Sequence, residues 1–148
     1  MKIGIASDHR GYELKKKIIE KLTKENYEFI DYGTYSTEST DYPDYAFILG
    51  ENVTNKNVSY GVAICGSGIG ISIACNKVKG IRCAKVSTIE EAEVTRIDND
   101  SNVIALSENI DLETALEIVR KFVTTPCSQL EKHQRRINKI KEYEEKCI

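Results

Sequence analysis

A cysteine followed by a glycine-rich loop carries the strongest chemical signal in this sequence. Cys65 ends the apolar run at 60–65, and the loop at 66–70 follows it directly. Glycines let a backbone approach a ligand closely, and amides at the start of a helix attract anions. The same amides favour the thiolate form of a cysteine placed there. Cys65 is therefore predicted to be either a nucleophile or general base, or a small buried side chain that ends a strand.

The spacing of this loop excludes two common phosphate-binding motifs. The glycines at 66, 68 and 70 lack the interval of a dinucleotide fingerprint, and no Gly-Lys-Ser/Thr follows them as a Walker loop requires. A plain turn between a strand and a helix is the simpler interpretation of such a loop alone. Its chemical interest therefore depends on Cys65 and on the polar residues that the fold brings near it.

Two further groups of residues could bind a polar substrate or exchange protons with it. Asp8 and His9 follow the first apolar run, as either a helix cap beside a surface histidine or a polar pair facing the same crevice as Cys65. A basic cluster near the end of the chain could clamp a phosphate, although a solvated helix face has the same composition. The members of this cluster are Lys132, His133, Arg135 and Arg136.

Alternating apolar runs and amphipathic segments must position these residues. Such alternation predicts a parallel sheet with helices on both faces, in a single domain spanning residues 1–148. Ligands bind at the carboxyl ends of the strands in such sheets, where we expect the segments 7–11, 65–70 and 98–101 to meet. The predicted strands are 2–7, 27–32, 60–65, 81–86 and 102–106, and the predicted helices are 11–25, 43–56, 69–78, one ending near 97, 111–124 and 128–145.

Composition limits the class of function. The chain has 148 residues, of which 41% are hydrophobic and 30% charged, as expected of a globular domain. Its 21 Lys+Arg against 23 Asp+Glu give a net charge of −2, so we expect no nucleic-acid partner. No apolar run approaches the roughly 20 residues of a membrane span, and the first residues are typical of a strand rather than of a signal peptide.

The cysteines and histidines predict a reducing compartment and no structural metal. Five cysteines, an odd number without a CxxC pair, argue against a disulfide framework and favour a cytoplasmic protein. The four cysteines other than Cys65 lack its setting and are interpreted as structural. The two histidines have no zinc-ligand spacing. We therefore expect no structural zinc site, and no cofactor is expected.

Four motifs, in order along essentially the whole chain, resemble one enzyme family. The segments SDHRGYELK, DYGTYSTESTDYP, ICGSGIGISIACNK and NDSNVIAL, with HQRR near the end, are similar to ribose-5-phosphate isomerase B and the related galactose- and allose-6-phosphate isomerases. The resemblance implies a metal-free aldose–ketose isomerase of phosphorylated sugars that works as a homodimer or a dimer of dimers. It also implies a three-layer α/β/α sandwich around a parallel sheet with strand order 2-1-3-5-4.

Matching residues carry the family's site onto this chain. The general base falls on Cys65, while Lys132 and Arg136 match phosphate-binding positions. The family builds each site across the dimer interface, so the C-terminal helix is expected to pack on the partner subunit. The remaining substrate contacts fall on Asp8, His9, Tyr42, Gly66, Ser67, Gly68, Ile69, Gly70 and Asn99.

Three positions depart from the family pattern. Asp98 stands where the family often has a histidine that opens the sugar ring; His9, which we favour, or a protonated Asp98 could serve here. Lys132 replaces an arginine, which keeps the charge but loses the bidentate geometry. Asn109 replaces a phosphate-contacting arginine and leaves the length of the substrate open.

The implied chemistry moves a proton between C1 and C2 of an open-chain sugar through an enediolate. We expect the Cys65 thiolate to take the proton, while the amides of 66–70 and the hydroxyl of Ser67 stabilise the oxyanion. The expected reaction interconverts ribose 5-phosphate and ribulose 5-phosphate. Two alternatives stay open at this stage: an isomerase of allose or galactose 6-phosphate, and a non-catalytic module that binds a sugar phosphate.

Overall fold

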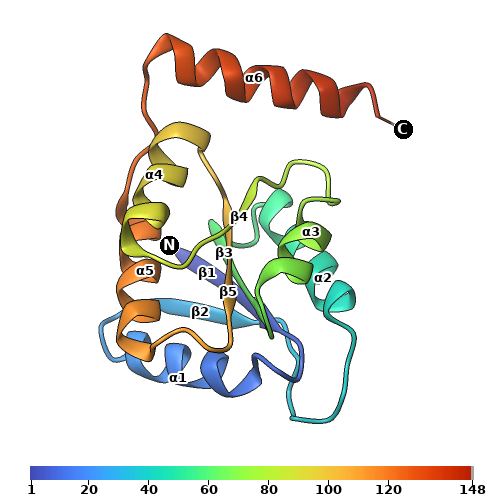
Figure 1. Cartoon of the computed structure of the whole chain (residues 1–148), viewed down its shortest axis with the longest axis vertical. Coiled ribbons are helices and arrows are strands. Elements are labelled where there is room, and N and C mark those ends of the chain that lie inside the picture. Colours follow the sequence, from blue (N-terminus) through green and yellow to red (C-terminus); the bar gives the residue numbers. More distant parts are fainter. Residues whose placement is uncertain (148) are drawn as a thin grey trace.

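A five-stranded parallel sheet forms the centre of the computed structural model, which describes residues 1–147 (Figure 1). The strands are β1 (Lys2–Ser7), β2 (Glu28–Asp31), β3 (Tyr60–Cys65), β4 (Cys83–Lys85) and β5 (Val103–Ser107). The helices are α1 (Tyr12–Thr23), α2 (Tyr42–Thr54), α3 (Ile69–Cys75), α4 (Ile89–Asn99), α5 (Leu112–Thr124) and α6 (Glu131–Glu145). The strand order β2-β1-β3-β5-β4, parallel throughout, confirms the expected α/β class and topology.

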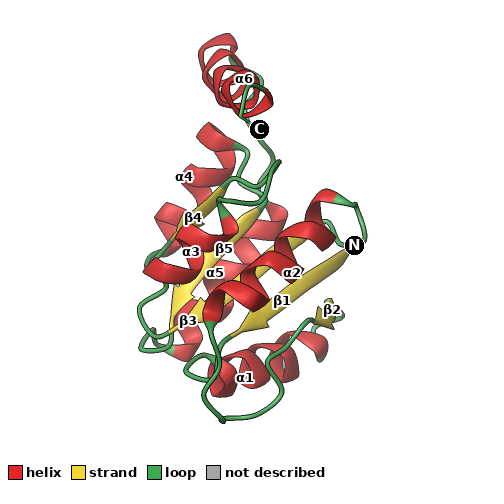
Figure 2. Cartoon of the chain, turned by 90° about the vertical axis from the view of Figure 1, so that its right-hand side faces the viewer, coloured by secondary structure: helices red, strands yellow, loops and turns green. Residues whose placement is uncertain are grey.

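Helices cover both faces of the sheet and make it the middle of three layers (Figure 2). Successive side chains of a strand point to opposite faces, so β3 divides its residues between two cores. Val62 and Ile64 pack with α1, α4 and α5, whereas Ala63 and Cys65 pack with α2 and α3. Cys65 therefore ends its strand on the α2–α3 side of the sheet.

Local signals fix where two of the helices begin. Pro43 occupies the first turn of α2, where its missing N–H costs no hydrogen bond. Thr88 precedes α4 and forms a capping box with Glu91, each side chain accepting a hydrogen bond from the other residue's backbone N–H at 3.1 Å. These two caps place α2 and α4 close to the bounds that the sequence predicts.

The edge strand β4 is shorter than the predicted 81–86. The side chain of Asn76 takes up both backbone groups of Cys83, donating to its carbonyl at 2.9 Å and accepting from its N–H at 2.8 Å. Ile81 belongs to the preceding turn, because its N–H donates to the Val78 carbonyl at 3.1 Å. The ladder on this side therefore begins only at Cys83, and α3 ends at Cys75 instead of residue 78.

Helix α6 lies outside both helical layers, across the amino ends of the strands (Figure 1). Its contacts with the rest of the chain include Glu144, whose carboxylate accepts the Gly80 N–H at 2.5 Å just ahead of β4. Ile137 is the one residue of α6 that is buried within the described chain, while Ile140 and Tyr143 are exposed. None of the described helices is long and apolar enough to span a membrane.

Candidate active site

The segments that follow β1, β3 and β5 meet at the edge of the sheet where the strands end. The Asp8 N–H donates to the Ile64 carbonyl at 3.2 Å. The Glu108 N–H donates to the Cys65 carbonyl at 2.9 Å. These bonds bring together most of the residues that the sequence predicts for catalysis. We call this set the Cys65 group: Asp8, His9, Tyr42, Cys65, Gly66, Ser67, Gly68, Ile69 and Gly70.

The sulfur of Cys65 is directed to the glycine loop. The residue is only 4% exposed, but its Sγ accepts the Gly68 N–H at 3.2 Å. Gly68 has φ +79, and a Cβ there would lie 2.9 Å from the backbone carbon of Leu106. Only glycine fits that conformation and space, so the loop that holds the sulfur depends on Gly68. The two interpretations of Cys65 thus combine: it is buried among apolar residues, and its sulfur accepts an amide hydrogen.

Part of the loop's hydrogen-bonding capacity is used within the loop itself. The Ile69 N–H donates to the hydroxyl oxygen of Ser67 at 3.1 Å, and the Gly68 N–H is taken by Cys65. The carbonyl of Gly66 accepts the Ser107 hydroxyl at 2.8 Å. The predicted oxyanion site therefore reduces to the amides of Gly66, Ser67 and Gly70 and the hydroxyl hydrogen of Ser67.

Asp8 organises the start of α1 without being its N-cap. The N-cap residue is Gly11, and the predicted capping role of Asp8 is wrong in that detail. One carboxylate oxygen of Asp8 accepts the N–H of Arg10 at 2.9 Å and of Gly11 at 3.1 Å. Asp8 is 5% exposed, and no described residue bonds its other carboxylate oxygen. That oxygen is the one available to a substrate hydroxyl.

Paired hydrogen bonds to Thr40 hold His9. The His9 N–H donates to the Thr40 hydroxyl at 3.1 Å, and the Thr40 N–H donates to Nδ1 of His9 at 3.1 Å. A neutral imidazole that accepts at Nδ1 carries its hydrogen on Nε2. His9 therefore has a donor on its outer nitrogen, and this donor requires no ionised ring.

Tyr42 closes the group from the side of α2. A Cβ placed on Gly70 would lie 2.7 Å from Cζ of Tyr42 and 3.0 Å from its hydroxyl oxygen. The tyrosine ring thus rests on the backbone of Gly70, which explains why glycine is needed at that position. Tyr42 itself remains partly exposed and is available to a ligand at the loop.

The other predicted site residues lie at the opposite edge of the sheet. Asp98 and Asn99 end α4, which delivers the chain to the amino end of β5. The Asn99 carbonyl accepts from Arg82, which itself precedes β4. The expectation that the segment 98–101 shares an edge with Cys65 in one chain is therefore wrong, because a helix antiparallel to the strands ends where they begin. We call this second set the Asn99 group: Asp98, Asn99, Lys132 and Arg136.

Helix α6 supplies the basic part of the Asn99 group. Nε2 of His133 lies 3.5 Å from Oδ1 of Asp98, which ties α6 to α4. Arg135 is neutralised by an ion pair with Glu131. Lys132 and Arg136 are exposed and form no ion pair within residues 1–147. The two cations that the sequence assigns to phosphate binding are thus available on this helix, as are Lys139 and Lys141 further along it.

Comparison with known proteins identifies the family. Residues 3–140 match the family described as Ribose/Galactose Isomerase. The chain belongs to this family. It is 38% identical over 146 residues to ribose-5-phosphate isomerase B of Mycobacterium leprae, covering 97% of this chain and 90% of that protein.

Solved structures of ribose/galactose isomerases share the fold along almost the whole chain. Ribose-5-phosphate isomerase B of Clostridium thermocellum is 45% identical, with a TM-score of 0.94 and 99% of each chain covered. The Mycoplasma genitalium enzyme, solved with bound ribulose 5-phosphate, is 37% identical, with a TM-score of 0.90 and 97% and 96% of the two chains covered.

One feature of this ribose/galactose isomerase site escaped the sequence prediction. Nε of Arg10 donates to Oε2 of Glu108 at 2.6 Å, so an ion pair spans the loop above Gly66. This partner raises the pKa of Arg10 above its ordinary value. Each residue follows a strand at the same edge, which could have flagged both of them, but their pairing depends on side-chain conformations that no sequence motif encodes.

No cluster of three or more metal-ligating side chains is found in the described part of this family member. The only histidine of the Cys65 group, His9, uses one ring nitrogen for Thr40. The cysteine of that group shares its sulfur with a backbone amide. The Cys65 group presents backbone amides, a thiol, a carboxylate and an imidazole to a ligand.

Proposed function

We propose that the chain interconverts ribose 5-phosphate and ribulose 5-phosphate at two sites shared between the subunits of a homodimer. The observation that carries the proposal is the position of the Cys65 sulfur, which accepts a loop amide 3.2 Å away among polar residues of the same edge. Family membership and the ribulose 5-phosphate held by the Mycoplasma genitalium relative support the choice of substrate.

The separation of the two groups supports a shared site. They lie at opposite ends of strands such as β3, six residues long, and a strand of that length spans roughly 20 Å. A pentose phosphate does not reach across that distance. A second copy in the opposite orientation would bring its Asn99 group to the first copy's Cys65 group, and two-fold symmetry would then complete both sites.

Cys65 is assigned as the base that transfers the proton. As a thiolate it removes the proton from C2 of the open-chain aldose; the C2–H electron pair forms the C1=C2 double bond, and the carbonyl π pair moves onto O1 to give an enediolate. The hydroxyl proton on O2 then passes to O1, the O2 electron pair forms the new carbonyl at C2, and C1 takes the proton back from sulfur. This gives the ketose and leaves the S–H electron pair on sulfur as the thiolate. The free amides of Gly66, Ser67 and Gly70 would stabilise the oxyanion, and each donor of this kind lowers the barrier by about 3 kcal/mol.

His9 is the stronger candidate for opening the sugar ring. Its Nδ1 accepts from Thr40, so Nε2 carries the hydrogen and can donate it to the ring oxygen. Asp98 could act this way only as a neutral acid, and its carboxylate lies beside His133. A pH–rate profile of Asp98→Asn distinguishes them, because an unchanged profile leaves the step to His9.

Lys132 and Arg136 of the partner subunit are assigned to the phosphate. Both are exposed and without ion pairs in the described chain, as a site awaiting a dianion requires. Asn109, exposed beyond β5, contributes no charge there. This leaves room for a second candidate, a hexose 6-phosphate, whose longer chain would place its phosphate differently.

A substrate panel tests the proposed function. The rates of aldose–ketose conversion are compared for ribose 5-phosphate, allose 6-phosphate and galactose 6-phosphate, with and without a chelator. The proposal expects the highest kcat/KM for the pentose and no effect of the chelator. A higher kcat/KM for either hexose would replace the substrate, and binding without turnover of all three would replace the enzyme with a sugar-phosphate-binding module.

A cytoplasmic location is proposed on the chemistry of the cysteines. All five are free thiols in the structure, and Cys65 must be reduced to act as a base. A thiol-dependent enzyme with an exposed cysteine such as Cys147 is suited to a reducing compartment. Cell fractionation with an antibody to the chain tests this location.

A further inference from the structure

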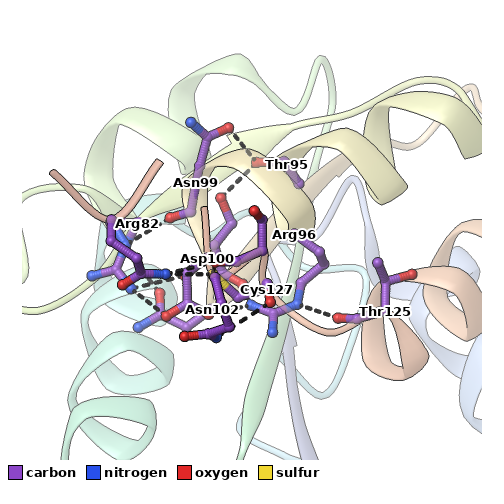
Figure 3. Close-up of polar contacts among 12 residues, drawn as sticks. Arg82, Thr95, Arg96, Asn99, Asp100, Asn102, Thr125 and Cys127 are labelled. Atoms are coloured by element: carbon purple, nitrogen blue, oxygen red, sulfur yellow. Dashed lines mark hydrogen bonds and ion pairs between the residues drawn. The ribbon is translucent and has the colours of Figure 1, made fainter. Parts of the chain in front are cut away.

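Two arginines hold the turn that carries Asn99 (Figure 3). Arg82 contributes all of its described side-chain bonds to this turn. Its Nε donates to the Asn99 carbonyl at 3.0 Å, and its Nη2 donates to the Asp100 carbonyl at 2.8 Å and to Oδ2 of Asp100 at 3.2 Å. The guanidinium thus donates hydrogen bonds to two successive carbonyls and to one carboxylate oxygen, all within Asn99 and Asp100.

Arg96 also donates hydrogen bonds to this turn, to Asp100 and Ser101. Its Nη1 donates to Oδ1 of Asp100 at 2.8 Å and to the Ser101 carbonyl at 2.7 Å. Unlike Arg82, it is also part of the core, at 5% exposure and 5.0 Å from the Tyr60 ring. Each carboxylate oxygen of Asp100 therefore has its own guanidinium, one from a core arginine and one from Arg82, which serves only the turn.

The backbone explains why the turn needs such support. Asp100 has φ 47 and ψ 45, the left-handed conformation that usually ends a helix on glycine. A carboxylate between two guanidiniums makes aspartate suitable where glycine would be the default. The Asn99 side chain is left exposed, its oxygen accepting a long 3.4 Å bond from Thr95 and its nitrogen unbonded within the described residues.

We propose that Arg82 is a positioning residue for catalysis: by clamping Asn99 and Asp100 it directs the Asn99 amide into the site of the partner subunit. The inference rests on the proposed shared site and adds a residue that no motif of the sequence marks. Arg82 has no role as a base, acid or phosphate ligand in it. Its whole effect is transmitted through the conformation of the turn.

Kinetics of two substitutions test the role directly. Arg82→Met is expected to lower kcat/KM for ribose 5-phosphate about 10- to 100-fold, because a small displacement of a positioning group costs that much. Arg82→Lys should recover only part of the loss, since an ammonium cannot reproduce the separate Nε and Nη2 donors of the planar guanidinium. Arg120→Met is the matched control: Arg120 donates to both carboxylate oxygens of Glu25, at 2.8 and 2.6 Å, and it makes no described side-chain bond to either group. Unchanged constants for Arg82→Met would overturn the inference.

A purified heterodimer separates positioning from damage to the fold. Cys65→Ala and Arg82→Met chains, with different affinity tags, are co-expressed, and the mixed dimer is isolated. One of its sites combines an intact Cys65 with an intact Arg82, so about half of the wild-type activity is expected. If Arg82→Met disturbed the whole chain, its Cys65 would be inactive too, and the absence of recovery would overturn the inference.

The same experiment with Asn99→Ala in place of Arg82→Met tests the proposed function separately. Recovery in the Asn99 pair but not in the Arg82 pair leaves the shared site standing and rejects the positioning role. Absence of recovery in both pairs rejects the shared site, and the role of Arg82 falls with it. Recovery in both, with Arg82→Met impaired as a homodimer, supports both.

Discussion

The two edges of the sheet hold their functional residues by different means. At the carboxyl edge the Cys65 group is held mostly by backbone: amides bond Sγ of Cys65, the Asp8 carboxylate and Nδ1 of His9. At the amino edge the Asn99 group depends on side-chain charge, with Arg82 and Arg96 on Asp100 and His133 beside Asp98. Backbone amides preorganise the carboxyl edge. The amino edge depends on ion pairs and on the contacts of α6.

This difference assigns different tasks to the two edges. Fixed amide dipoles suit the developing oxyanion of an enediolate, because they need no reorganisation during the reaction. Lys132 and Arg136 are exposed on α6, a helix with one buried residue, and such cations suit a substrate phosphate that must enter and leave the site. Substitutions at the carboxyl edge should therefore affect kcat most strongly, and those at the amino edge should also affect KM.

The largest expected effect is the loss of the base. Cys65→Ala should lower kcat for ribose 5-phosphate by about 10²- to 10⁴-fold, the usual contribution of a positioned base, with substrate binding retained. Steady-state kinetics and calorimetric binding measure the two quantities. Cys147→Ala, at an exposed cysteine near the end of the chain, is the control and should match the wild type. Turnover retained by Cys65→Ala would remove Cys65 from the mechanism.

The next effect comes from separating the two edges of neighbouring chains. Ile73 is 57% exposed on α3, the helix that follows the Cys65 loop, and we expect a second copy to cover this apolar side chain. Ile73→Lys should weaken association by about 2 kcal/mol or more, as at a buried interface position, and should lower activity at dilutions where the dimer dissociates. Sedimentation velocity over a concentration series measures both states. Val94→Lys, also on an exposed apolar residue, is the comparison. A monomer with full activity would contradict the shared site.

A smaller and more local effect is expected at the loop. Gly68→Ala places a methyl group at φ +79 against the β5 backbone, which should displace the amide that Cys65 Sγ accepts. Gly80→Ala has a similar φ of +91 but meets only the Thr54 side chain at 3.0 Å. Gly80→Ala should lose about 1–2 kcal/mol of stability, the cost of a left-handed alanine, and Gly68→Ala should lose more because its methyl group also meets backbone atoms. Only Gly68→Ala should lower kcat. Equal losses of kcat would show that the loop has no special role; denaturant titration and kinetics supply the data.

The carboxyl edge was largely predictable from the sequence, and the amino edge was not. Strand-and-helix alternation places Asp8 and Cys65 at one edge by topology alone, and the glycines mark the loop between them. Asp98 and Asn99 were misplaced, because the chain direction of α4 sends them to the other edge. The clamp by Arg82 was invisible, since it joins residues from different elements through side-chain conformations that depend on packing. The bonds that consume two loop amides escaped prediction for the same reason.

The smallest effect concerns Lys15, which holds the start of the loop that leads to Thr40, the partner of His9. Its ammonium is fully buried and donates to Asp31 and to the Thr34 carbonyl, both at 2.5 Å, at the base of the loop that carries Thr40 to His9. Burial lowers the pKa of Lys15 below its ordinary value of 10.5, and Asp31 only partly opposes this. Between the lowered pKa and 10.5 the unfolded chain binds more protons than the folded one, so stability contributed by this residue rises with pH in that window.

The unfolding free energy of the wild type minus that of Lys15→Met should therefore increase as pH rises towards 10.5. Tyr35, whose ring lies 5.3 Å from the ammonium, also titrates there, so Tyr35→Phe is used as the background for both chains. A difference that stays flat or falls with pH would show that the ammonium is better stabilised than its burial implies.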